Sequence, residues 1–199
     1  MDDSSRTGVD ALRVDRRRFL GLGVLGGAAS LLALPTGTSW ATSHNRAEAL
    51  LLSCMDYRFI NDTQRYMATR QLDKKYYQVM LAGAALAANP PRGTPPPDVR
   101  AWNTTFWDHL ATALELTRRH NPRGALSRVI VIDHRDCGAY DLLLPGCCRD
   151  SAGKLDPAKE TAAHAAQLRT LRTEIVRRHD KMQVELLLMN LDGKVDTIT

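Results

Sequence analysis

The chain has 199 residues, of which 44% are hydrophobic and 25% are charged, and its net charge at pH 7 is +5. These values are typical of a globular protein with a buried core, and they indicate one domain with short additions rather than several domains. No basic stripe alternates with aromatic residues, which argues against nucleic-acid binding, and four cysteines, two of them adjacent, are too few and too irregularly spaced for a disulfide-stapled scaffold.

The N-terminal segment has the pattern of an export signal. Three arginines at 16–18 precede an uncharged apolar stretch at 19–34, and the run Ser39-Trp40-Ala41 places small residues where a signal peptidase cleaves. The pattern resembles a twin-arginine signal, which is read by the twin-arginine export machinery, with Asp15 where Ser or Thr is usual. That machinery carries folded proteins, which suits a chain whose thiolates bind metal before they meet an oxidising compartment.

We therefore expect two parts, a twin-arginine-type export signal at 1–41 and a mature domain at 42–199. The protein would then be periplasmic or extracellular. The alternative is a signal that is never cleaved and stays as an N-terminal membrane anchor. Against it, the apolar stretch has 16 residues, whereas a spanning helix needs about 20.

The first half of the mature domain reads as strand, helix, strand and loop. The run AEALLLSC at 47–54 is typical of a short buried strand, and Asn61-Asp62-Thr63 offers an N-cap for a helix at 63–72. The run YYQVMLA at 76–82 predicts a second strand. Five prolines at 89–98 then predict a surface loop without regular structure.

The second half continues the alternation of helices and strands. Apolar residues near helical spacing predict a helix at 102–120, and the aliphatic runs at 128–132 and 184–189 predict two more strands. Asp156-Pro157 starts a long helix whose apolar side carries Leu168, Leu171, Ile175 and Val176. Strands alternating with helices of this length predict an α/β fold, a mostly parallel β-sheet flanked by helices.

Three candidate metal ligands stand at the ends of predicted strands. Cys54 ends the first strand, and the third strand runs into His134 and Cys137. In a parallel sheet the carboxyl ends of the strands lie along one edge, where ligands collect. Two thiolates and one imidazole are the donor set of a tetrahedral Zn²⁺ site with one position left open for catalysis. Cys137 precedes a predicted helix, whose N-terminus favours the ionised thiol.

Asp56 and Arg58 follow Cys54 at alternate positions, in the pattern C-x-D-x-R. If the chain stays extended, both side chains point the same way as Cys54. A carboxylate there can accept a hydrogen bond from a zinc-bound hydroxide, or it can take the fourth zinc position itself in a closed state. Pairing with Arg58 would keep Asp56 ionised and off the metal, so the dyad is a candidate gate.

Together, C-x-D-x-R and H-x-x-C-G resemble the motifs of the β-class carbonic anhydrases, over the chain from about Ala47 to the C-terminus. The resemblance implies a zinc ion held by Cys54, His134 and Cys137, with Asp56 and Arg58 as catalytic residues. It also implies a homodimer or higher homo-oligomer. The reaction implied is the reversible hydration of CO₂ to bicarbonate, with zinc hydroxide as the nucleophile.

The sequence departs from that family near the motifs. Tyr57 stands where a small residue is usual and could narrow the entrance, Leu81-Ala82-Gly83-Ala84 replaces Arg-Asn-Ala-Gly, and Asp133 replaces a glycine. These changes leave two alternatives open. One is a zinc hydrolase of CS₂ or COS on the same fold; the other is a non-catalytic zinc-binding assembly protein in which Asp56 permanently occupies the fourth position.

Other chemistry-bearing residues have no assigned role. The adjacent Cys147 and Cys148 fall in a predicted loop, where semi-buried thiols, a second metal site and a disulfide to another subunit all stay open. His109, His120 and His164 are candidate proton shuttles by residue type alone. We expect each of them to be an ordinary surface histidine.

Overall fold

The computed structural model of the protein describes residues 47–91, 93, 99–120 and 126–199. The predicted export signal and most of the proline-rich loop lie outside the described residues. No helix within the described ranges is both long and apolar enough to cross a membrane.

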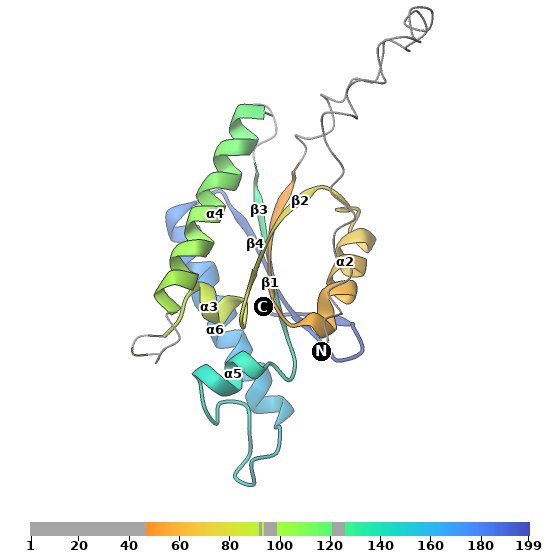
Figure 1. Ribbon diagram of the computed structural model, residues 1–199, viewed down its shortest axis with the longest axis vertical. Helices are drawn as coiled ribbons and strands as arrows, with labels where there is room; N and C mark the ends of the chain where they lie inside the picture. Colours follow the sequence, from red (N-terminus) through yellow and green to blue (C-terminus); the bar gives the residue numbers. More distant parts are fainter. Residues whose placement is uncertain (1–46, 92, 94–98, 121–125) are drawn as a thin grey trace, which may run out of the picture. The chain divides into compact units, whose positions relative to one another are not determined.

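A five-stranded sheet forms the centre of the described domain (Figure 1). The first four strands pair with one another in parallel, and the fifth pairs antiparallel with the fourth. This confirms the predicted α/β fold with a mostly parallel sheet. The short antiparallel strand at the C-terminus was not predicted separately. In spatial order the strands are β2 (Tyr76–Leu81), β1 (Ala49–Cys54), β3 (Arg128–His134), β4 (Gln183–Met189) and β5 (Val195–Thr197).

Long helices cover both faces of this sheet, with α4 and α6 on one side and α2 on the other (Figure 1). Shorter helical turns follow the strand ends. The helices are η1 (Tyr57–Phe59), α2 (Ile60–Thr69), α3 (Ala85–Ala88), α4 (Val99–His120), α5 (Gly138–Leu143) and α6 (Pro157–Arg178).

Strand β1 is buried on both faces, because its side chains alternate between two hydrophobic clusters. Leu50 and Leu52 pack in the cluster that contains Phe106 of α4 and Leu168 of α6. Ala49 and Leu51 pack in the cluster that contains Met67 of α2, on the opposite face. The sheet therefore holds the end of β1 firmly, and Cys54 is the last residue of that strand.

Several details of the predicted helices are wrong. Helix α4 begins at Val99, not at 102, and α2 ends at Thr69, not at 72. Helix α2 begins at Ile60, not at 63, because Asp56 accepts a hydrogen bond from the Arg58 backbone N–H and starts the turn η1, which runs directly into α2. Helix α6 begins where predicted, with Asp156 as its N-cap. Its apolar side is narrower than expected, since Val176 is 40% exposed.

Candidate metal centre

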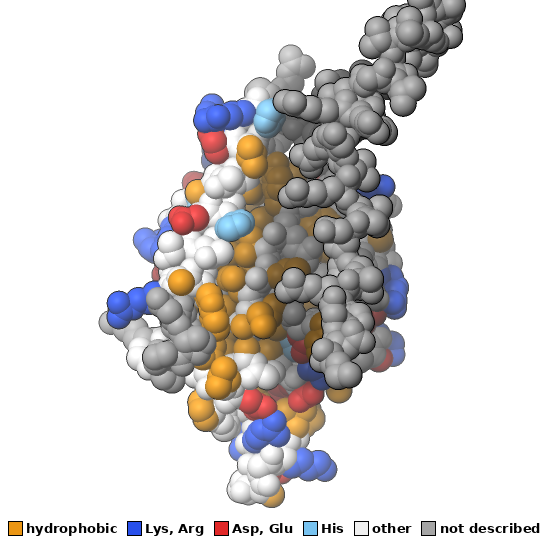
Figure 2. Space-filling view, viewed as in Figure 1, with side chains coloured by type: hydrophobic (Ala, Val, Ile, Leu, Met, Phe, Trp, Pro, Cys, Tyr) orange, Lys and Arg blue, Asp and Glu red, His pale blue; other side chains and the backbone are white. Residues whose placement is uncertain are grey.

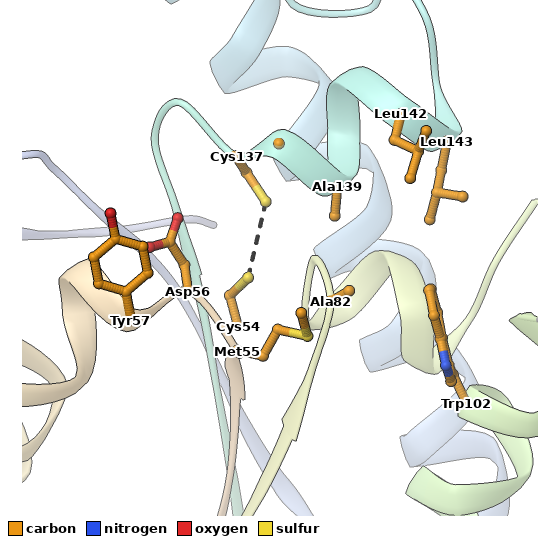
Figure 3. A pocket seen from close by; sticks show the side chains of 11 residues that line it. Cys54, Met55, Asp56, Tyr57, Ala82, Trp102, Cys137, Ala139, Leu142 and Leu143 are labelled. Atoms are coloured by element: carbon orange, nitrogen blue, oxygen red, sulfur yellow. Dashed lines mark hydrogen bonds between the residues drawn. The ribbon is translucent and has the colours of Figure 1, made fainter. Parts of the chain in front are cut away.

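The three predicted ligands come together at the carboxyl edge of the sheet. Cys54 ends β1, His134 ends the adjacent parallel strand β3, and Cys137 is the N-cap of α5. Their ligand atoms lie within 4.8 Å of one another, and the Sγ atoms of Cys54 and Cys137 are 3.9 Å apart. Figure 3 shows the two sulfurs facing each other at the cavity wall. This group of side chains is able to hold a metal ion.

The His134 ring is oriented for coordination through Nε2. Its Nδ1 lies 2.8 Å from the Arg135 carbonyl oxygen, and because a carbonyl only accepts, Nδ1 keeps its proton. The side chain is 2% exposed and stacks on Phe59, with ring centroids 4.3 Å apart. Within the described residues Nε2 is buried without a hydrogen-bond partner. A buried ring nitrogen left unpaired beside two thiols fits a metal ligand.

The two sulfurs, 3.9 Å apart, shift the pKa values of the two thiols in opposite directions. A hydrogen bond from Cys137 lowers the pKa of Cys54 against the opposing effect of burial, and His134 and the Gly83 N–H, 3.3 Å from the Cys54 sulfur, lower it further. The Cys54 sulfur and burial both raise the pKa of Cys137. That the N-terminus of α5 favours the ionised form of Cys137 stays a prediction, and in this pair the neighbouring Cys54 sulfur opposes it.

Asp56 and Arg58 form a pair, but not by the predicted route. The backbone is extended at Asp56 and then turns through η1, so Arg58 does not continue in the direction of Cys54. Its guanidinium folds back instead: Nε lies 3.1 Å from both Asp56 carboxylate oxygens, and Nη2 lies 2.8 Å from Oδ2. These hydrogen bonds hold the pKa of Asp56 below its usual range. Asp56 Oδ2 lies 3.8 Å from His134 Nε2.

Asp136 is a contributor that the sequence reasoning missed. Its Oδ2 accepts from Arg58 Nη1 at 3.0 Å and its carbonyl oxygen accepts from Nη2 at 2.9 Å. Asp136 has a φ of 53°, which Asp tolerates better than most residues. Buried Glu160 holds the same loop by accepting from the Asp136 N–H and from Arg135. The only sequence signal was its place between His134 and Cys137.

A cavity of about 330 Å³ opens beside the thiols. Cys54, Asp56 and Cys137 line it, and the wall as a whole is largely apolar (Figure 3). Arg58 does not line it. Tyr57, which we expected to narrow the entrance, is part of the wall and is 82% exposed. The other lining residues are Met55, Ala82, Trp102, Gly138, Ala139, Leu142 and Leu143.

The remaining singled-out residues lie apart from the three ligands. The Cys147 and Cys148 sulfurs are 2.7 Å apart, and in the described part of the chain neither belongs to a group of three or more potential metal ligands. His109 and His120 are exposed on α4, as expected. The expectation that His164 is a surface histidine is wrong, because its side chain is 0% exposed. Its Nδ1 lies 2.8 Å from Asp133 Oδ2.

No family model matches the chain. Among solved structures, it is similar to a β-carbonic anhydrase from Trichomonas vaginalis (14% identity, 78% of this chain and 84% of that one, TM-score 0.44). It is also similar to a carbonic anhydrase from Glaciozyma antarctica (13%, 77% and 83%, TM-score 0.44). A carbon disulfide hydrolase gives 12% identity over 78% of this chain and 80% of that one, with a TM-score of 0.40.

Two proteins show a closer relationship in sequence. An uncharacterized protein of Rickettsia conorii is 34% identical over 154 residues, which cover 77% of this chain and 73% of that protein. An uncharacterized protein of Rickettsia bellii is 32% identical over 155 residues, which cover 77% of this chain and 83% of that protein. The chain belongs to the same protein family as these two Rickettsia proteins.

Proposed function

We propose that the protein is a zinc-dependent carbonic anhydrase that hydrates CO₂ reversibly to bicarbonate. The observation that carries the proposal is the convergence of Cys54, His134 and Cys137 beside a small, mostly apolar cavity. The same cavity contains Asp56, a carboxylate paired with an arginine. The resemblance of the C-x-D-x-R and H-x-x-C-G motifs to those of the β-class carbonic anhydrases supports the same assignment.

Cys54, His134 and Cys137 would hold the zinc ion, and a set of three protein ligands leaves one coordination position open. When bound there, zinc supplies a Lewis acid that lowers the pKa of a water at the open position to about 7. The two sulfurs also balance the charge of the ion. The orphaned His134 Nε2 gains the partner that it otherwise lacks in the described structure.

Asp56 would orient the attacking water. Its carboxylate is beside His134 Nε2, at 3.8 Å, and it can accept a hydrogen bond from the water that attacks CO₂. Arg58 engages both carboxylate oxygens, which keeps Asp56 ionised and away from the fourth zinc position. Asp136 in turn fixes the guanidinium from the other side. We propose that this pairing is the open state of the gate.

The cavity wall suits a small apolar substrate. Trp102, Leu142 and Leu143 offer CO₂ apolar surface, so the gas enters without competing for the hydrogen bonds of Asp56. The product bicarbonate is charged, and the same apolar wall disfavours its retention. The proton released on hydration leaves toward solvent through the exposed side of the site.

Substitution of Arg58 by Ala tests the gate. We expect Arg58→Ala to keep one zinc per chain but to lose roughly 10–100-fold in CO₂ hydration, the usual effect of removing a group that orients the groups at a metal. Stopped-flow hydration and elemental analysis measure the two quantities. Arg65→Ala is the matched control, because Arg65 also pairs with an aspartate but lies on α2. Unchanged turnover in Arg58→Ala would contradict the gate.

The same preparation separates the alternatives. Wild-type protein that releases H₂S from CS₂ or COS but does not hydrate CO₂ would be a hydrolase of those gases. Protein that binds zinc and turns over none of the three gases would be a zinc-binding assembly protein. The apolar wall accommodates all three gases, so the assays must be run side by side.

We also propose that the protein is exported after cleavage behind Ala41, on the sequence pattern described above. N-terminal sequencing of protein recovered from the periplasm or medium is expected to begin at Thr42. A mature protein that retains residues 1–41 would indicate the membrane anchor instead.

We further propose a homo-oligomer. Large apolar side chains are exposed at Met55, Met80 and Leu142 in the described structure. Figure 2 shows hydrophobic side chains gathered along the middle of the face that carries α4. A second copy of the chain would cover such surface, and sedimentation velocity is expected to give at least a dimer.

A further inference from the structure

Asp133 is a buried carboxylate directly before the candidate ligand His134. It is 1% exposed, yet both of its oxygens have hydrogen-bond donors. The Ala85 N–H donates to Oδ1 at 3.1 Å, the Tyr140 hydroxyl donates to Oδ2 at 2.6 Å, and His164 Nδ1 lies 2.8 Å from Oδ2. Three hydrogen-bond partners hold this buried side chain in one orientation, and each partner that is lost removes part of that restraint.

Two of these partners lie next to backbone groups that contact the cysteines. Ala85 is two residues from Gly83, whose N–H donates to the Cys54 sulfur at 3.3 Å. Tyr140 is in the first turn of α5, where its N–H donates to the Cys137 carbonyl at 3.0 Å. Asp133 itself adjoins His134 in β3. One carboxylate is therefore joined to the support of every candidate ligand.

His164 is the third partner of the Asp133 side chain and holds it from helix α6. It projects from the long helix α6 and is fully buried, and its ring lies 3.8 Å from the Tyr140 ring between centroids. Because α6 packs along the sheet through Leu168 and Leu171, the position of His164 is set by the core rather than by a loop. Through Asp133, hydrogen bonds therefore connect the six-residue helix α5 to the long helix α6, which packs on the sheet.

We propose that Asp133, with Tyr140 and His164, is the positioning network of the metal centre, and that it sets metal affinity by fixing the two sulfurs and the imidazole relative to one another. The inference rests on the metal site of the proposed function. It assigns a role to three buried residues that do not themselves touch the metal or the substrate. Such outer groups orient ligands and are worth about 10–100-fold in metal affinity.

The test is Tyr140→Phe, which removes one hydroxyl and keeps the ring against His164. We expect zinc affinity, measured by competition with a chromophoric chelator, to fall roughly 10–100-fold. We also expect the absorption bands of the Co²⁺-loaded protein to shift, since they report ligand geometry. Tyr66→Phe is the matched control: Tyr66 is on α2, its hydroxyl accepts from Arg70 at the end of that helix, and both readouts are expected to equal wild type.

Stability is measured separately by denaturant unfolding in the presence of chelator. If Tyr140→Phe unfolds more easily but keeps wild-type zinc affinity and cobalt bands, the network is only structural and the proposal is overturned. Asp133→Asn replaces one accepting oxygen by an NH₂ group that faces hydrogen-bond donors. We expect it to lower zinc affinity further than Tyr140→Phe does. Wild type that binds no metal overturns both proposals. Zinc binding that weakens in Tyr140→Phe, in a protein that does not hydrate CO₂, overturns the proposed function alone.

Discussion

At Gly83 the backbone conformation and a close contact together exclude a side chain. Its φ is 72°, and a Cβ added there would lie 3.1 Å from the Ala139 Cβ of α5. The same residue donates its N–H to the Cys54 sulfur. Gly83 therefore allows the turn after β2 to approach α5 closely, and its side chain is absent for a geometric reason.

Gly83→Ala is expected to destabilise the protein more than Gly153→Ala. Both glycines have a φ near 75°, at 72° and 77°, so each substitution costs about 1–2 kcal/mol of left-handed strain. Only Gly83 adds a contact, since nothing lies within 4 Å of the Cβ position at Gly153. Urea unfolding midpoints measure the difference. Equal midpoints for the two variants would show that α5 moves aside without cost.

At the scale of elements, α6 is attached to the sheet by a narrow apolar stripe. Leu168, Leu171 and Ile175 are fully buried, whereas Val176, one residue further on, lies partly in solvent. The spacing of three and four residues repeats once per helical turn, so the stripe faces the sheet along most of the helix. Because His164 is on the same helix, this packing also fixes the position of His164 next to Asp133.

Leu171→Ala is expected to lower the free energy of unfolding by about 2–5 kcal/mol, since it leaves a cavity in a packed core. Val176→Ala on the same helix is expected to change it by less than about 0.5 kcal/mol. Guanidinium unfolding monitored by circular dichroism measures both. A comparable loss in the two variants would mean that another surface covers Val176.

For the whole molecule, metal binding and folding are expected to be coupled. Cys54 is 83 residues away from Cys137 in the sequence, so the unfolded chain lacks the assembled site. A ligand that binds only the folded state stabilises it by about 4 kcal/mol at a thousandfold excess over its dissociation constant. Zinc should therefore raise the melting temperature.

We expect a strong chelator to lower the melting temperature of wild type and of Cys147→Ser, but to have little effect on Cys54→Ser. Both variants replace a cysteine sulfur by an oxygen, but only Cys54 is in the three-ligand group. Scanning calorimetry with and without chelator makes the comparison. An equal chelator response in Cys54→Ser would place the metal elsewhere.

Local patterns in the amino-acid sequence were enough to predict four strands of the sheet, the start of α6 and the three residues that meet at the sheet edge. These depend on local patterns: runs of aliphatic residues form buried strands, and Asp156 before a proline forms an N-cap. Parallel strands end at one edge, so Cys54 and His134 had to be neighbours once β1 and β3 paired. Periodicity and chain direction were sufficient for these features.

The surroundings of those ligands depend on contacts between segments that are distant in the sequence. Arg58 reaches Asp56 through a turn, Asp136 holds Arg58 across 78 residues of sequence, and His164 is buried against Asp133. A polar residue has no periodic signature, and whether it is exposed or buried depends on which distant elements cover it. The partners that orient a site are set by packing between distant segments. Such packing cannot be predicted from a short stretch of sequence.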